Sequence, residues 1–295
     1  MRSHRYKGII LAFLAGLLWG TIGIFVKKLT GLTPMGTAFF RLLVAFVGII
    51  SIVTYLNLWE ELKSSLSYWK FLTILSFIMS LSLIFAVSGF YDTTVANASI
   101  LNNTTPLYIP LFGLLIWEKT NKKEWLGILL GFFGILLIFS THGISFESQR
   151  FIGNVFSIMS AIFLAVYTIL SKKIRLHFSS FIIMFWVFGL GSLFIFLESI
   201  FFQKSFFLKY EYADFYYVLG LGIFGTFLAH TFYTTSLKYI KASTASLIGL
   251  SSPISATLYA MILLREIPPI LTLLGLAFSI TGIFYVIRSE RVINN

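Results

Sequence analysis

The sequence predicts an all-α integral membrane protein of ten transmembrane helices, arranged as two inverted five-helix repeats. First, 58% of the 295 residues are hydrophobic and only 11% are charged, whereas soluble domains carry about 25% charged residues. Second, apolar stretches of about 20 residues, the length that crosses a bilayer as a helix, recur along the whole chain. Third, motifs of the first half return about 147 residues later in the second half.

Ten apolar stretches follow one another with short polar connections between them. Their approximate bounds are 8–26, 35–55, 70–90, 95–116, 124–140, 151–171, 180–202, 214–236, 243–264 and 269–287. A soluble protein with so many apolar stretches would lack the polar residues needed to coat its surface. The sequence contains no cysteine, which excludes a disulfide framework and thiol chemistry.

The positive charge indicates how the chain is oriented. The net charge is +11, and lysine and arginine concentrate in cytoplasmic loops of membrane proteins. With the N-terminus inside, the inner segments hold 15 of these residues and the outer loops hold 6. We therefore expect a multi-pass protein of the cell membrane with both termini in the cytoplasm. No polar domain is present that could read nucleic acid.

A repeat relates the two halves of the chain. Setting Pro106 on Pro253 aligns "ASILNNTTPLYI" with "ASLIGLSSPISA", and Gly8 aligns upstream with Gly153. The repeats extend over about 1–145 and 150–295, with five predicted spans each. Because five is odd, the second repeat enters the membrane from the opposite side. Inverted repeats of this kind are typical of secondary transporters, which bind their solute near the midplane where the repeats meet.

Two prolines near the middle of equivalent spans predict interrupted helices. Pro106 cannot donate an N–H to the carbonyl of Asn102, and Pro253 cannot donate one to the carbonyl of Gly249. An unpaired carbonyl is tolerated inside a membrane only where it faces protein or a water-filled cavity. We expect both spans to present polar midsections to a shared cavity. The alternative is a pair of kinks that serve packing only.

The order of motifs in both halves resembles a known family. The first half contains "LLWGTIGIFVKK" at 17–28, Arg41 in the second span and "WEKTNKKEWLGILLGFFGILLI" at 117–138. The second half contains "LKYIKASTASLIGLSSPISA" at 237–256 and "LLREIPPILTLLGLAFSITGIFYVI" at 263–287, with Glu266 in the place of Glu118. Over its whole length the chain resembles EamA-type members of the drug/metabolite transporter superfamily. The resemblance implies a ten-helix, two-repeat bundle that moves small organic solutes, often amino acids or other metabolites, outward.

Candidate substrate contacts place hydrogen-bonding or aromatic groups inside the predicted spans. They are Trp19, Asn102, Asn103, Tyr108, His230, Ser251 and Ser252. The asparagine side chains could bind a solute or bond neighbouring helices. His230 is an ionisable group within a span and could carry protons, or it could be a neutral residue bonded to a hydroxyl. Arg41 is interpreted as a gating or structural residue, with contact to an anionic group as the alternative.

These features favour a secondary transporter of small organic metabolites, with a broad-specificity efflux carrier of drugs or amphipathic compounds as the alternative. A non-transporting scaffold fits less well, because the loops offer little docking surface. An enzyme is not expected, since no acid pair or activated nucleophile is visible. No cofactor and no metal are expected either. The expected partners are a small-molecule substrate and the lipid bilayer. The Gly127–Gly131 pair predicts helix packing within a monomer or across a homodimer.

Overall fold

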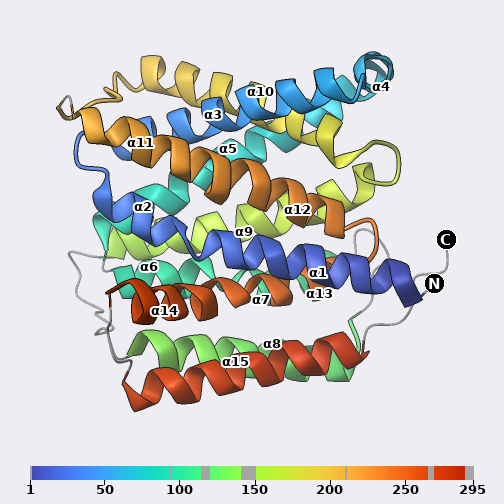
Figure 1. The fold of residues 1–295 in the computed structure, drawn as a ribbon, viewed down its shortest axis with the longest axis vertical. Helices are drawn as coiled ribbons and strands as arrows, with labels where there is room; N and C mark the ends of the chain where they lie inside the picture. Colours follow the sequence, from blue (N-terminus) through green and yellow to red (C-terminus); the bar gives the residue numbers. More distant parts are fainter. Residues whose placement is uncertain are drawn as a thin grey trace.

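The computed structural model describes residues 2–93, 95–113, 120–140, 151–209, 211–264 and 269–289. Within these ranges the chain consists of helices, their connections and one isolated antiparallel bridge between Leu32 and Phe207. The long helices lie along one common direction, and their connections gather at the two ends of the bundle (Figure 1). The predicted all-α fold is confirmed.

The helices of the first half include two pairs that divide one predicted span each. They are α1 (Arg2–Trp19), α2 (Ile22–Lys28), α3 (Pro34–Tyr55), α4 (Trp59–Ser65), the 3-10 turn η1 (Leu66–Tyr68), α5 (Trp69–Asp92), α6 (Val95–Asn102), α7 (Thr105–Gly113) and α8 (Lys122–Ser140). The first predicted span is thus divided into α1 and α2, and the fourth into α6 and α7.

The helices of the second half repeat part of this pattern. They are α9 (Phe151–Ile174), α10 (Ser180–Phe201), α11 (Tyr212–Gly220), the π-helix η4 (Leu221–Leu228), α12 (Ala229–Ser236), α13 (Ala242–Gly249), α14 (Ser251–Leu264) and α15 (Ile270–Ser289). The eighth predicted span therefore contains a π-helix between two α-helices, and the ninth is divided into α13 and α14.

Seven helical segments of the described chain are long and apolar enough to cross a membrane. They are His4–Val26, Pro34–Tyr55, Trp59–Asp92, Phe151–Ile174, Ser180–Phe201, Tyr212–Ser236 and Ile270–Ser289. The predicted fourth and ninth spans, each divided into two shorter helices, are not among these seven. The fifth corresponds to α8, whose first three residues are all charged. The count of ten spans stays a prediction.

Helices α3 and α10 share the same type of N-terminal cap and the same type of C-terminal end. The Thr33 hydroxyl accepts the Gly36 N–H at 3.0 Å, and the Ser179 hydroxyl accepts the Ile182 N–H at 3.4 Å. Side-chain oxygens at this position satisfy the unpaired N–H groups of the first turn. Beyond the opposite ends, the residues Asn57 and Gln203 share a left-handed φ of 51°.

The two large packed cores each combine residues of both halves. One contains residues of α3 and α5 together with residues of α9 and α10. The other joins α1, α6, α7 and α8 to α9, α12, α13 and α15. The halves are therefore interleaved rather than folded as separate bodies.

Glycines allow α8 and α15 to pack closely. Gly127 lies against Gly282, and Gly134 lies against Gly275, so the two helices run antiparallel. The backbone of Gly131 also lies against Gly282, while its hydrogen side faces Leu247 of α13. Small residues are typical of helix contacts inside membranes, where backbones must approach closely. The Gly127–Gly131 face is thus used within the chain, and α8 and α15 form a layer of their own (Figure 1).

Candidate functional site

The interruption between α6 and α7 is bonded by threonine hydroxyls. Thr104 Oγ1 donates to the Leu101 carbonyl at 2.6 Å, and Thr105 Oγ1 donates to the Asn102 carbonyl at 3.1 Å. Pro106 leaves the Asn102 carbonyl without its usual backbone donor, and the Thr105 hydroxyl takes that place. Pro106 is the second residue of α7, a place in the first turn where the missing N–H costs little. The helix is interrupted as predicted, and its own threonines satisfy part of the break.

The second interruption falls at Leu250, between α13 and α14, with Pro253 in the first turn of α14. The Ser251 hydroxyl is buried and has no hydrogen-bond partner among the described residues. Ser252 is partly accessible, and its carbonyl accepts the Ser255 hydroxyl at 2.9 Å. Pro106 and Pro253 are both buried within the protein. The two interrupted spans meet directly, because α7 packs against α13.

Helix α1 lies directly against α14 at the second interruption. Gly16 faces Ser251, and Gly20 faces Ser255 and the Ser252 carbonyl, so side chains larger than hydrogen would separate the helices. The Ser255 hydroxyl is 3.4 Å from the Gly16 carbonyl. The end of α1 therefore reaches the broken midsection of α14.

Trp19, the last residue of α1, contacts the rings of two residues of α12. Its ring centroid lies 5.3 Å from that of His230 in an edge-on arrangement and 5.0 Å from that of Tyr233. His230 is 4% exposed, and its Nδ1 has no partner among the described residues. Trp19 keeps partial accessibility and borders Gly249, the last residue of α13. This cluster joins two of the predicted contact residues to one of the interruptions.

Arg41 is buried where α3 meets the π-helix η4. Its Nε donates to Thr226 Oγ1 at 2.9 Å, and its Nη2 donates to the Gly225 carbonyl at 3.2 Å. A π-helix widens the backbone turn and is common at functional sites. No ion pair between Arg41 and a carboxylate occurs among the described residues. The second repeat has no clear counterpart to Arg41; Trp186, which lies in that neighbourhood of α10, donates its indole N–H to Ser65 Oγ at 2.9 Å.

The remaining predicted contacts lie at the first interruption. Asn102, Asn103 and Tyr108 are all partly accessible. Asn102 Oδ1 is nevertheless buried and without a partner among the described residues, while Tyr108 packs on the core that also contains Trp19. The assignment of these residues to a substrate site stays a prediction.

Sequence reasoning missed several elements of this region. The break between α1 and α2 at Gly20–Thr21 and the π-helix have no proline to signal them. Thr226 was overlooked because only its contact with Arg41 distinguishes it from other hydroxyl residues. Glu118 and Glu266 lie outside the described residues.

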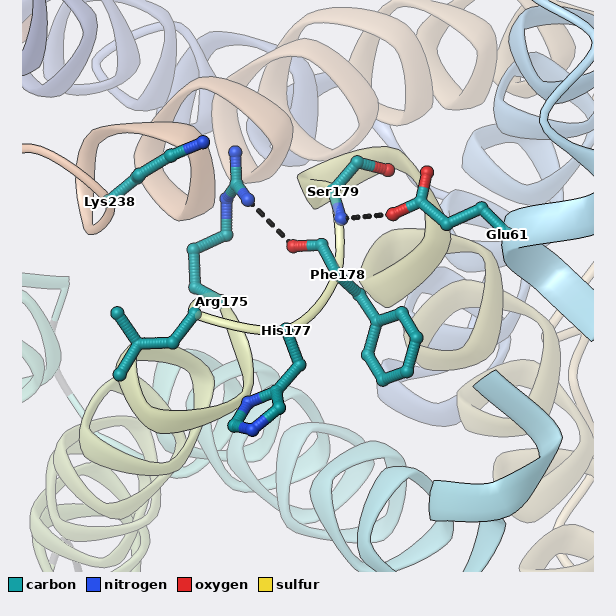
Figure 2. A pocket seen from close by; sticks show the side chains of 7 residues that line it. Glu61, Arg175, His177, Phe178, Ser179 and Lys238 are labelled. Carbon is teal, nitrogen blue, oxygen red and sulfur yellow. Dashed lines mark hydrogen bonds between the residues drawn. The ribbon is translucent and has the colours of Figure 1, made fainter. Parts of the chain in front are cut away.

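A separate cavity of about 300 Å³ lies at one end of the bundle (Figure 2). It is lined by residues of the α9–α10 connection together with Glu61 and Lys238. None of the predicted contact residues lines it.

Comparison with known proteins defines the class of this chain. The EamA-like transporter family matches residues 6–140 and again 151–288. Two proteins of Archaeoglobus fulgidus, each named "Uncharacterized transporter", are 25% and 29% identical and cover 96% and 94% of this chain and 96% of their own lengths. A solved crystal structure shares the fold with a TM-score of 0.82 and 17% identity, covering 95% of this chain and 96% of that chain.

Taken with the helical membrane fold, these matches define a membrane transport protein. The chain belongs to the EamA-like transporter family, as its motifs predicted.

Proposed function

We propose that the protein is a secondary transporter that moves a small organic metabolite, an amino acid or a compound of similar polarity, out of the cell by alternating access. The observation that carries this proposal is the meeting of two interrupted spans through α7 and α13. Buried polar atoms without partners among the described residues, Asn102 Oδ1 and Ser251 Oγ, lie at these interruptions. A transported solute could satisfy such groups while it occupies the middle of the bundle.

We further propose ten spans in two inverted repeats. Gly8 of α1 lies against Tyr239 and Ile240, which follow α12. Its counterpart Gly153 of α9 lies against Asp92 and Thr93, at the end of α5. These contacts are related by the sequence repeat, since each partner is offset by about 147 residues.

The ends of α3 and α10 support the same arrangement. The Leu58 N–H donates to the Val53 carbonyl at 2.9 Å, and the Lys204 N–H donates to the Ser199 carbonyl at 2.9 Å. Both closures follow a residue with left-handed φ, which is typical of a Schellman helix end. The antiparallel pairing of α8 with α15 agrees with opposite orientations for two equivalent spans.

Both termini are proposed to lie on the cytoplasmic side of the cell membrane. α1 begins and α15 ends at the same end of the bundle (Figure 1), where the Arg5 guanidinium bonds the Ile287 carbonyl. The excess of lysine and arginine in the segments on this side supports the orientation. A monomer or a homodimer is compatible with this arrangement.

The second candidate function is efflux of aromatic or amphipathic compounds. The Trp19, His230 and Tyr233 rings favour it, because aromatic faces can stack on a flat solute. Arg41 favours instead a solute with a carboxylate, since a buried guanidinium without an ionic partner among the described residues attracts anions.

Counterflow in proteoliposomes tests the proposal. Vesicles preloaded with one amino acid, amine, nucleoside or aromatic drug at a time are assayed for accumulation of its labelled form. Asn102→Ala and Ser252→Ala are expected to reduce accumulation at least tenfold while the protein stays folded. Ser51→Ala is the matched control, because Ser51 is exposed on α3 and bonds only its own helix. Normal counterflow in both site variants would remove these residues from the site.

An imposed pH gradient separates the coupling mechanisms that remain open. Flux that responds to the gradient in the natural protein but not in His230→Ala would assign proton coupling to His230. Flux that ignores the gradient in both would assign exchange or facilitated diffusion. Absence of counterflow for every compound class would overturn the transporter mechanism proposed for this chain.

A further inference from the structure

The end cavity is built from three connections that lie far apart in the sequence. The α9–α10 connection contributes Arg175 and Phe178, the residue Glu61 comes from α4, and Lys238 follows α12. The cavity holds about 300 Å³, room for a phosphate group and its immediate substituents. In Figure 2 the Lys238 side chain and the guanidinium of Arg175 extend toward the same part of this space.

Arg175 is a buried cation whose bonding is incomplete. It is 8% exposed, its Nη1 donates to the Phe178 carbonyl at 2.6 Å, and its buried Nε has no partner among the described residues. Burial lowers the pKa of Arg175 from its ordinary value, the physical sign of a desolvated charge. An anion in the cavity would stabilise this charge and could accept the unused N–H.

The carboxylate in the cavity, Glu61, attracts the charge of Arg175 electrostatically, but its hydrogen bond is made to the backbone. Glu61 Oε1 accepts the backbone N–H of Ser179, the residue that caps α10. A negative charge there is stabilised by the N-terminal end of the helix dipole. Among the described residues, no ion pair joins Arg175 or Lys238 to a carboxylate. The two cations are therefore available to a ligand.

The fold itself does not require these charges. Under the repeat proposed above, Arg175, Lys238 and Glu61 correspond to positions at the opposite end of the bundle. Those positions hold Leu29, Tyr91 and Phe207, which are apolar or aromatic. The Tyr91 hydroxyl donates to the Leu32 carbonyl at 3.0 Å, and Leu32 is the position equivalent to Phe178, whose carbonyl accepts from Arg175. The equivalent connection, between α2 and α3, is thus built without these basic residues.

Exposed aromatic residues place the cavity at the level of lipid headgroups. Trp59, Tyr68 and Trp69 are 41%, 39% and 52% exposed on α4, η1 and the start of α5. Tyr68 touches the wall of the cavity, since its ring lies 5.3 Å from those of His177 and Phe178. Tryptophan and tyrosine are enriched at membrane–water interfaces. Helix α4 is seen nearly end-on in Figure 1, across the direction of the bundle.

We propose that this cavity binds a phosphate group held by Arg175 and Lys238, and that the phosphate belongs to the headgroup of an anionic lipid. Arginine and lysine form charge-assisted hydrogen bonds to phosphate oxygens. Basic pockets on the cytoplasmic side of membrane proteins bind such headgroups. The bound lipid would link the α9–α10 connection to the α12–α13 connection.

The test measures thermal unfolding of the full chain in detergent with added phosphatidylglycerol or phosphatidylcholine. Phosphatidylglycerol is expected to raise the unfolding temperature of the natural protein more than phosphatidylcholine does. Arg175→Gln and Lys238→Gln are expected to weaken the apparent affinity for phosphatidylglycerol at least tenfold. Lys173→Gln, an exposed cation at the end of α9 outside the cavity, is expected to bind as the natural protein does.

Lys238→Gln keeps the test decisive if Arg175→Gln fails to fold, because Lys238 is exposed. Undiminished protection of Lys238→Gln by phosphatidylglycerol would overturn the site. Equal loss in Lys173→Gln would overturn it as well, since a diffuse positive surface would then explain binding. Protection by inorganic phosphate as strong as that by phosphatidylglycerol would overturn the lipid assignment. Transport is not measured, so these outcomes are separate from those of the proposed function.

Discussion

The Thr105 hydroxyl is expected to stabilise the fold by replacing the hydrogen bond that Pro106 removes. Thr105 is 5% exposed, and its Oγ1 lies 3.1 Å from the Asn102 carbonyl and 3.4 Å from the Ala161 carbonyl of α9. Thr105→Val keeps the shape of the side chain and deletes the donor. The part-buried Asn102 carbonyl would then lose this side-chain donor.

The expected cost follows from the bonds that are lost. One neutral hydrogen bond contributes about 0.5–1.5 kcal/mol, and side-chain bonds inside membrane proteins average about 0.6 kcal/mol with a maximum near 1.7. The contact to Ala161 is long, so we expect Thr105→Val to cost about 1 kcal/mol. In a chain of this size that corresponds to a fall of about 2–3 °C in unfolding temperature.

Tryptophan fluorescence of the purified protein during heating measures this change. Thr105→Ser retains the hydroxyl and is expected to unfold within about 1 °C of the natural protein. In a Pro106→Ala background the backbone N–H restored at this position can reach the Asn102 carbonyl, so Thr105→Val should cost less there. An equal cost in both backgrounds would refute the idea that Thr105 compensates for the proline.

Three further changes test the packing and the electrostatics. Lys241→Met should destabilise the protein by about 3 kcal/mol in denaturant unfolding, because it removes the ionic partner of the fully buried Glu124. In the natural protein Lys241 Nζ lies 2.8 Å from Glu124 Oε1. Adding Glu124→Gln to Lys241→Met should recover most of the loss. Gly282→Leu should cost more than about 3 kcal/mol or prevent folding, because its side chain would meet the backbone of α8. Gly23→Leu, which meets nothing within 4 Å, should be tolerated in the same expression and unfolding assays. Arg41→Lys should lower the unfolding free energy by about 2 kcal/mol, because an ammonium group cannot reproduce the fork that bonds two acceptors.

The sequence was sufficient to predict helices but not how they pair. Long apolar stretches and few charges predict membrane helices directly. Which faces meet is less visible, because a membrane helix is apolar all round and small residues rather than hydrophobic stripes determine its contacts. Gly127 was recognised as a packing residue, yet only the structure identifies Gly282 as its neighbour.

The site was predictable where proline marks a position and not where geometry alone does. Pro106 and Pro253 located two interruptions to within a few residues. The π-helix follows from no single residue type, and its bond to Arg41 joins positions 184 residues apart in the chain. Arg175 and Lys238 belong to separate loops, so their convergence also required the fold.

The interleaved cores have a consequence for the origin of the chain. Helices α3 and α5 bury their side chains against α9 and α10, so a protein of half this length would leave those surfaces uncovered. Under the inverted repeat proposed above, an ancestor with one repeat could cover them only by joining a second copy in the opposite orientation. Fusion of the two copies into one gene would then have fixed the orientation of each copy in the membrane. The charged residues of the two copies could afterwards diverge.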